Sequence, residues 1–168
     1  MAIVNENLYN IDAGILPKDA CIIIVQTEWN QPVVSKLLEG CTKILQQYGM
    51  TNYKVINVPG AFEIPFAIKH CWETYNNKSD SYRIGKPKAF IALGCVLRGG
   101  TPHFDYVCKA ITEGVLQLNL ILPVPTIFGV LTLDNQQQAD ERTGGVHGNK
   151  GEEAALSALK MITLNYSE

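Results

Sequence analysis

The stretch from Leu97 to His103 combines residue types that could bind an anion and move a proton beside it. Gly99 and Gly100 carry no side chain, so their backbone N–H groups can approach an oxyanion closely, and the positive end of the following helix adds a favourable potential. Thr101 can cap that helix or donate its hydroxyl group to the same anion. His103 falls in the first helical turn, where an imidazole can transfer protons. The spacing predicts a phosphate-binding loop with an acid–base residue beside it.

A structural alternative exists for each of these residues. The loop can be a glycine-rich turn with a threonine cap, and a lone histidine is more often satisfied by a local hydrogen bond than catalytic. The flanking Gly-Gly-Thr-Pro sequence favours a functional role for His103. Hydrolysis of nucleoside triphosphates is excluded, because Gly94–Thr101 lies one residue from a P-loop but has Gly100 where the lysine belongs.

Two cations bracket a second glycine-rich segment, 143–149, for which we expect flexibility. Arg142 can bind a phosphate through two parallel hydrogen bonds, and Lys150 adds a point charge. From the residues alone, two solvated surface cations are the favoured interpretation. His147 lies in the same segment and is interpreted as a surface residue or a neighbour of the site.

Three further residues occupy positions that suit a small-molecule site. Trp29 follows a predicted strand, where a large ring can cover a flat ligand. Glu63 begins a helix, where the dipole stabilises a carboxylate, and its oxygens could accept hydrogen bonds from two hydroxyls of a polyol. Phe128 lies inside a strand and is by default a core residue. We expect no metal site, because the His, Cys and carboxylate residues lack the spacing of metal ligands.

Strands and helices must position these residues, and the hydrophobic pattern predicts where they lie. Continuous apolar runs of strand length are typical of strands that are buried on both faces of a sheet. The predicted strands are 21–26, 53–58, 90–97 and 125–131. Apolar residues at helical spacing, with Pro32 at one start and Gly49 at one end, predict helices. The predicted helices are about 32–48, 64–75, 103–122, 135–142 and 152–164.

Strand and helix alternate four times, which predicts right-handed crossovers and a four-stranded parallel sheet. The expected fold is α/β, a three-layer α/β/α sandwich of the flavodoxin-like class. Ligands in such folds bind at the carboxyl ends of the strands. The loops at those ends are 27–31, 58–63, 97–103 and 131–135. The candidate residues therefore gather at one end of a single domain that spans 1–168, with 1–19 outside the core pattern and 76–88 as a polar loop.

Composition excludes several classes of protein. The chain has 168 residues, of which 46% are hydrophobic, and a net charge of −2, so nothing indicates binding to nucleic acid. No apolar run is long enough to span a membrane, and the N-terminus lacks the pattern of a secretory signal, so we expect a cytoplasmic protein. The five cysteines form no CxxC motif, which favours buried, reduced thiols.

Six motifs together resemble the 6,7-dimethyl-8-ribityllumazine synthase family. They occur in order, with few gaps, from about Cys21 to Leu164. The motifs are TEWN (27–30), VPGAFEIP (58–65), ALGCVLRGGTPHFDYV (92–107), PTIFGVLT (125–132), QADERTGG (138–145) and HGNKGEEAA (147–155).

The resemblance implies a transferase that acts in the penultimate step of riboflavin biosynthesis. The family condenses 5-amino-6-(D-ribitylamino)uracil with 3,4-dihydroxy-2-butanone 4-phosphate, loses phosphate and water, and needs no cofactor. The matching motifs imply His103 as the proton-transfer residue and Gly100, Thr101 and Arg142 as the phosphate site. The residues implied for the pyrimidine and its ribityl chain are Trp29, Asn30, Ala61, Phe62, Glu63, Cys95, Val96, Phe128 and Lys150.

The resemblance also implies self-association. In this family the phenylalanine of the FGVLT motif comes from the neighbouring subunit, so Phe128 would complete the pocket of another copy. Trp29 replaces the phenylalanine that is frequent in the family, and both rings can stack on the pyrimidine. A ring of five copies is expected, and the GNKG motif resembles members that form shells of sixty. A functional link to riboflavin synthase is also implied.

Two rival functions remain open from the residues. One is a flavodoxin-like module that binds a flavin or phosphate without chemistry, which needs no pocket shared between subunits. The other is an assembly protein whose site is vestigial. The presence of His103, Arg142 and Glu63 together argues against decay of the site.

Overall fold

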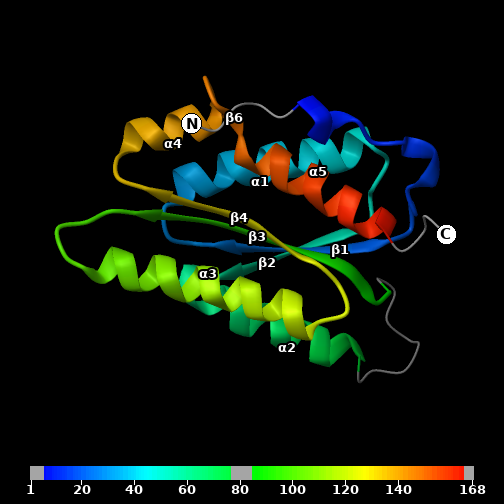
Figure 1. Ribbon diagram of the computed structural model, residues 1–168, viewed down its shortest axis with the longest axis horizontal. Helices are drawn as coiled ribbons and strands as arrows, with labels where there is room; N and C mark the ends of the chain where they lie inside the picture. The colour runs from blue at the N-terminus through cyan, green and yellow to red at the C-terminus, as the bar shows by residue number, and fades with distance from the viewer. Residues whose placement is uncertain (1–5, 77–84, 165–168) are drawn as a thin grey trace.

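A single parallel sheet organises the chain, whose computed structural model describes residues 6–76 and 85–164. The strand order is β2-β1-β3-β4, so β2 and β4 form the two edges (Figure 1). The strands are Cys21–Thr27 (β1), Tyr53–Val58 (β2), Pro87–Leu97 (β3) and Thr126–Leu133 (β4). All three pairings are parallel, as the alternation of strands and helices predicts.

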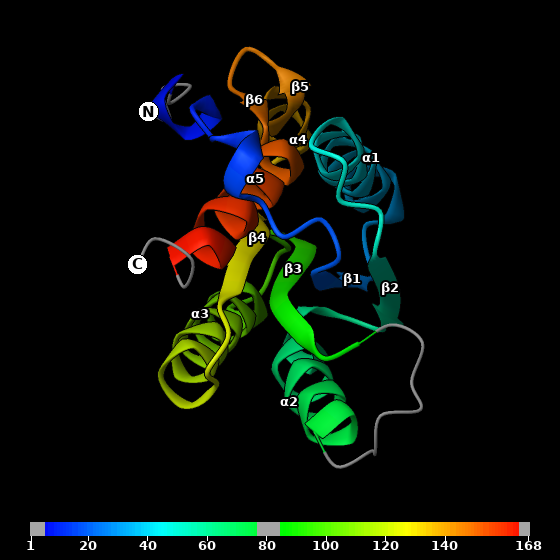
Figure 2. The ribbon, with the colours of Figure 1, turned by 90° about the vertical axis from the view of Figure 1, so that its right-hand side faces the viewer.

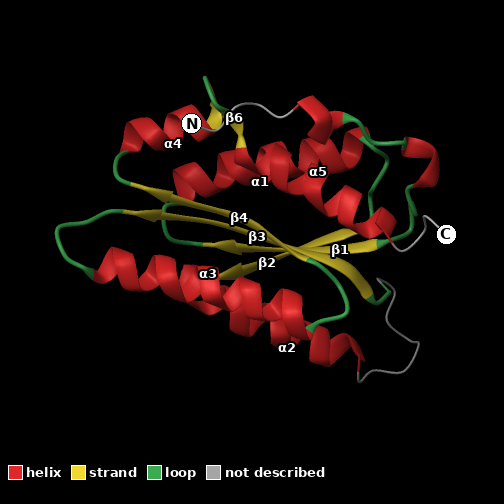
Figure 3. Cartoon of the chain, in the orientation of Figure 1, coloured by secondary structure: helices red, strands yellow, loops and turns green. Residues whose placement is uncertain are grey.

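Helices cover both faces of this sheet. Figures 2 and 3 show α1, α4 and α5 on one face and α2 and α3 on the other, which confirms the three-layer α/β/α fold. The α-helices are Gln31–Gln47 (α1), Ile64–Asn76 (α2), His103–Ile121 (α3), Gln136–Arg142 (α4) and Lys150–Thr163 (α5). Short 3-10 helices are Glu6–Tyr9 (η1), Ala13–Ile15 (η2) and Ala61–Glu63 (η3).

Strand β1 separates two hydrophobic cores, and all seven of its residues are buried. Ile22 and Ile24 face the core beneath α1 and α5, whereas Ile23 and Val25 face the core beside α2 and α3. Each such side chain contributes about 1.5–3 kcal/mol to folding when it is fully buried. This two-sided burial explains why the strand is a continuous apolar run rather than an alternating one.

Some element boundaries differ from the predicted ones. Strand β4 runs to Leu133, two residues beyond the predicted end. The 143–149 segment, expected to be flexible, is a short hairpin of β5 (Thr143–Gly145) and β6 (Gly148–Asn149). Helix α5 begins at Lys150 because the Asn149 side chain accepts hydrogen bonds from the first backbone N–H groups of the helix.

The N-terminal segment packs on the face that carries α1 and α5. Leu16 is buried in that core, and the hydroxyl of Tyr48 donates a hydrogen bond to the carbonyl of Tyr9. Of the polar loop predicted at 76–88, residues 77–84 lie outside the described residues, as do 1–5 of the N-terminal segment. None of the described helices is long and apolar enough to cross a membrane.

The carboxyl ends of all four main strands lie at one end of the molecule, on the left in Figure 1. Four connections meet there, and they link β1 to α1, β2 to η3, β3 to α3, and β4 to α4. This common end is where the sequence places the candidate loops, so the fold brings them into one region.

Candidate active site

Trp29 projects from the connection between β1 and α1 and is 72% exposed. Its backbone is fixed on both sides although its ring is free. The Trp29 N–H donates to the carbonyl of Pro59 at 3.1 Å, and the hydroxyl of Thr27 donates to the Trp29 carbonyl at 3.2 Å. The loops after β1 and β2 therefore hold the ring in the open, where it can stack on a flat ligand.

Asn30 links the same loop to β3. Its φ of 59° and ψ of 38° place it in the left-handed region, which asparagine tolerates better than most residues. Its side-chain amide donates to the carbonyl of Cys95 at 2.8 Å. Burial raises the pKa of the Cys95 thiol to about 11, so the thiol stays protonated near neutral pH and it is the backbone carbonyl of Cys95 that contacts Asn30.

Glu63 and Trp29 converge over Gly60. A Cβ atom at Gly60 would lie 3.1 Å from Oε2 of Glu63 and 3.7 Å from Cδ1 of Trp29, so a side chain there would crowd both groups. Ala61 is buried beneath them, whereas Phe62 is 64% exposed. This arrangement places a carboxylate beside an aromatic ring, which suits a ligand with a flat part and a polyol chain.

A groove of about 430 Å³ continues from Glu63 along edge strand β2 and helix α2. Its outer rim carries Phe66, which is 74% exposed and stacks on the ring of His70 with a centroid distance of 5.9 Å. Val58 and Ile56 form part of its floor. An exposed apolar groove beside a candidate site is a surface on which another molecule can pack.

The loop from β3 to α3 is open toward solvent. A Cβ atom at Gly99 or Gly100 would meet nothing within 4 Å, so an anion has free access to the backbone. Thr101 does not cap α3, since Pro102 is the N-cap residue and makes no side-chain cap bond. No described residue forms a hydrogen bond with the Thr101 hydroxyl, which can therefore donate to a ligand. His103 is exposed and begins the helix, as predicted.

Arg98 anchors the start of this open loop. Its Nε donates to Asp134 at 2.7 Å, its Nη1 donates to Asp105 at 3.2 Å, and its guanidinium lies 4.0 Å from the Phe104 ring centroid. The hydrogen bond to Arg98 lowers the pKa of the Asp134 carboxyl group. The Arg98 N–H also donates to the Leu133 carbonyl. The loop that follows β3 is thus tied to the end of β4.

Arg142 and Lys150 meet on the opposite face of the sheet from α3. Arg142 is not a solvated surface cation, because its side chain is only 14% exposed and pairs with Glu153. Lys150 lies 3.3 Å from the same carboxylate. The hairpin of β5 and β6 turns the chain back so that the end of α4 and the start of α5 become neighbours.

The chain does not bring all candidate residues into one pocket. Among the described residues, no hydrogen bond or ion pair joins Arg142 or Lys150 to the Gly99–His103 segment. Phe128 is half-buried on edge strand β4, where it packs against the core beside α3, as the partly buried Val96 does. The default interpretation makes Phe128 a core residue. In the single chain it packs against the core but is only partly buried.

Sequence reasoning missed Glu153 and Arg98. Glu153 lies three residues after Lys150, which is the spacing of neighbours on one helix face, and that spacing could have signalled the ion pair. Arg98 directly precedes the two glycines, but its partners come from distant positions in the sequence. Only the fold reveals that Arg98 and Asp134 meet.

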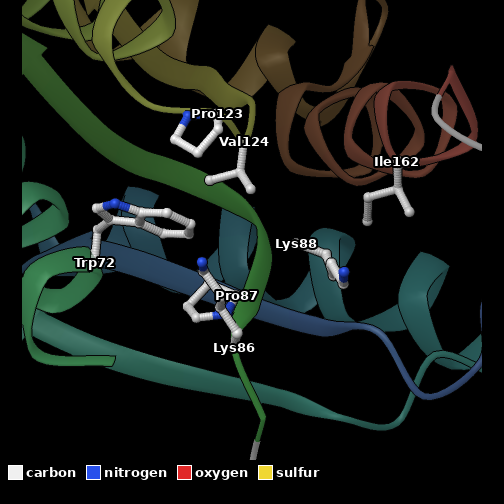
Figure 4. Close-up of a pocket in the computed structure, with 7 residues that line it drawn as sticks. All are labelled: Trp72, Lys86, Pro87, Lys88, Pro123, Val124 and Ile162. Carbon is white, nitrogen blue, oxygen red and sulfur yellow. The ribbon is translucent and has the colours of Figure 1, made fainter. Parts of the chain in front are cut away.

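A separate cavity of about 230 Å³ lies at the opposite end of the sheet (Figure 4). Lys86 lies over the Trp72 ring there, 4.5 Å from its centroid, and Pro123, Val124 and Ile162 complete an apolar wall. None of the candidate residues lines this cavity. Within the described part of the chain, no group of three or more His, Cys, Asp or Glu residues could hold a metal ion.

Comparisons with known proteins identify the family of the chain. A family model described as 6,7-dimethyl-8-ribityllumazine synthase matches residues 19–166. The 6,7-dimethyl-8-ribityllumazine synthase of Parabacteroides distasonis is 43% identical over 169 residues, which covers 98% of this chain and 99% of that protein. The protein of the same name from Porphyromonas gingivalis is 44% identical over 168 residues, which covers 98% of both. The chain therefore belongs to the 6,7-dimethyl-8-ribityllumazine synthase family.

Proposed function

We propose that this enzyme condenses 5-amino-6-(D-ribitylamino)uracil with 3,4-dihydroxy-2-butanone 4-phosphate to give 6,7-dimethyl-8-ribityllumazine, phosphate and water. This is the penultimate step of riboflavin biosynthesis. The observation that carries the proposal is that Trp29, Glu63 and the open Gly99–His103 loop follow three adjacent strands at the carboxyl end of the sheet, where Trp29 and Glu63 converge over Gly60. Membership of the family supports the same reaction.

The pyrimidine substrate fits the region between the first two loops. Trp29 stacks on the flat ring, and the Glu63 carboxylate accepts hydrogen bonds from the ribityl hydroxyls. Asn30, Ala61 and Phe62 form the surrounding surface with Cys95 and Val96 of β3, all at or near the ends of adjacent strands.

The phosphate substrate fits the loop after β3. Backbone N–H groups at Gly100 and Thr101 and the positive end of α3 stabilise the phosphate dianion. The amine of the pyrimidine attacks the ketone to form a Schiff base, and phosphate is then eliminated. His103 transfers protons in these steps. Ring closure depends mainly on holding the two substrates together in a fixed orientation.

Phe128 and Glu63 lie at opposite edges of the sheet, which supports a site shared between two copies. Phe128, Ala92, Val25 and Ile56 are paired in one row across the four strands. Three strand spacings separate the ends of this row by roughly 14 Å. A second copy could place the Phe128 edge against the groove beside Ile56 and complete the pocket near Glu63.

Repeating this contact gives a ring when the rotation between neighbouring copies closes. An edge that differs from the edge it meets makes a heterologous contact, which forms either a ring or an open filament, and a ring has one site per interface. We propose a homopentamer as the minimal active unit, with a shell of sixty copies as the further assembly. The product passes to riboflavin synthase, and no cofactor takes part.

The test is product formation by the purified protein. We expect it to convert the two substrates into 6,7-dimethyl-8-ribityllumazine, measured by absorbance, and to release one phosphate per product. The rival function, a binding module without chemistry, predicts substrate binding with no release of phosphate. That result with an intact assembly would overturn the proposal.

A further inference from the structure

Glu153 holds the two cations that bracket the β5–β6 hairpin. Its Oε1 accepts from Nη1 of Arg142 at 3.0 Å, and its Oε2 accepts from Nη2 at 3.1 Å. Oε2 also accepts from Nζ of Lys150 at 3.3 Å. Nη1 of Arg142 donates in addition to the carbonyl of His147. The side chains are mostly buried, with 14% of Arg142 and 24% of Glu153 exposed, so solvent weakens this pairing less than it weakens a surface pair.

This pairing uses one edge of the guanidinium and leaves another edge available. A guanidinium has five N–H groups in a rigid plane. Glu153 takes the edge formed by Nη1 and Nη2 and leaves the edge formed by Nε and the second N–H of Nη2. No described residue accepts a hydrogen bond from Nε of Arg142. That second edge has the spacing that binds two oxygens of a phosphate in parallel.

The position of Glu153 is itself rigid. Asn149 caps α5 by accepting from Gly151 N–H at 2.8 Å, and its side-chain amide donates to the carbonyl of Lys36 in α1. Gly151 packs so closely on α1 that a Cβ atom would lie 1.9 Å from the Leu37 carbonyl oxygen. The first turn of α5 therefore cannot shift without moving α1, and Glu153 is fixed with it.

We propose that Glu153 is a positioning residue that orients Arg142 for phosphate. It presents the Nε/Nη2 edge to the phosphate of the four-carbon substrate, which binds at the 99–103 loop of the next copy in the proposed ring, and keeps Lys150 beside it. The inference rests on the proposed function for the identity of the phosphate substrate. One carboxylate against two cations leaves one positive charge, which still attracts a dianion. Glu153 thus orders the cations without cancelling their charge.

The experiment compares Glu153→Gln with Glu152→Gln. The two residues are adjacent in the first turn of α5, so both variants lose one carboxylate at the same helix end. Glu152 pairs with Lys43 of α1 instead of with Arg142. Steady-state kinetics with each substrate varied in turn, using the assembled full-length protein, separates an effect on phosphate from an effect on the helix.

We expect Glu153→Gln to raise KM for the phosphate substrate about tenfold, less than the roughly hundredfold that a misplacement of about 1 Å can cause. KM for the pyrimidine should stay within about twofold, and Glu152→Gln should match the wild type. In the double variant Glu153→Gln/Arg142→Ala, KM for the phosphate substrate should equal that of Arg142→Ala alone, because Glu153 acts through Arg142.

Three outcomes would overturn the inference: equal behaviour of the two glutamine variants, an equal rise in both KM values, or tighter binding of phosphate by Glu153→Gln. The last would mean that Glu153 only competes with the ligand. Inhibition by inorganic phosphate, or its binding measured by calorimetry, gives a readout that does not need turnover. If the wild type makes no product but Glu153→Gln alone weakens phosphate binding, the proposed function fails and the role of Glu153 stands.

Discussion

The candidate residues differ in how firmly the chain holds them. Trp29, Thr101 and His103 are exposed, whereas Arg142 is largely buried and held by Glu153. Exposed groups at the carboxyl end of the sheet can adapt to two substrates that must react with each other. In the proposed mechanism, Arg142 and Lys150, which Glu153 holds together, fix the position of the leaving phosphate. Binding and orientation thus account for more of the proposed catalysis than acid–base strength does.

His103→Ala should lower the turnover number moderately. We expect a loss of about 10- to 100-fold, at the low end of the effect of a positioned acid–base group, because proximity of the substrates remains. Since the side chain is exposed, folding and assembly should be unaffected. The measurement is kcat at saturating concentrations of both substrates. A kcat equal to that of the wild type would remove His103 from proton transfer.

Arg142→Ala should weaken binding of the phosphate substrate far more than binding of the pyrimidine. A guanidinium can bind phosphate through two charge-assisted hydrogen bonds, whereas the ribityl chain carries no charge for it to meet. We expect KM for the phosphate substrate to rise by about 10-fold or more, as the loss of hydrogen bonds to a charged group of about 1.5–3 kcal/mol implies. Arg142→Lys keeps the positive charge but lacks the two parallel N–H donors of the guanidinium, so it should recover only part of the affinity for the phosphate substrate. An equal rise in both KM values would contradict the assigned role.

The packing of α5 on α1 determines where Arg142 and Lys150 lie. Gly151 packs directly against the backbone of Leu37 in α1. The Asn149 cap holds the same crossing, whereas the ion pair between Lys43 and Glu152, with Lys43 67% exposed, contributes little. A change in this crossing should therefore affect both stability and the geometry of the cations.

Gly151→Ala should destabilise the protein. The new methyl group would lie 1.9 Å from a backbone oxygen, and overpacking of this kind costs roughly 1–3 kcal/mol. Alanine favours the helix by about 1 kcal/mol, which is too little to offset the clash. Gly99→Ala is the matched control, because its methyl group would meet nothing within 4 Å. Chemical denaturation measures both free energies of unfolding, and equal values would show that α5 can move away from α1 at little cost.

The sequence predicts the strands and the open loop well, because both depend on neighbouring residues. The apolar run of β1 and the Gly-Gly-Thr-Pro-His stretch can be recognised in the sequence without knowledge of the fold. The pairing of Arg142 with Glu153 could not be predicted in this way. It depends on the hairpin of β5 and β6, and the glycine-rich sequence of that segment does not predict a hairpin. The placement of Phe128 on an edge strand also depends on the strand order, which local patterns do not fix.

The whole molecule presents two different edges to its surroundings. Edge strand β2 borders an apolar groove that leads to Glu63, whereas edge strand β4 carries Phe128. A chain that keeps half of a site at each edge is expected to be inactive alone. Dilution should therefore reduce activity when the ring dissociates, and sedimentation in parallel should show the loss of the oligomer at the same concentration.

The decisive measurement uses two differently tagged variants, Glu63→Ala and Phe128→Ala, which are co-expressed and purified through both tags. If each site combines Glu63 of one copy with Phe128 of the next, about a quarter of the sites in a random equal mixture are intact. The mixed assembly should then be several times more active than the mean of the two separate variants. If both residues act within one chain, no site is intact, and an activity equal to that mean would contradict the shared site.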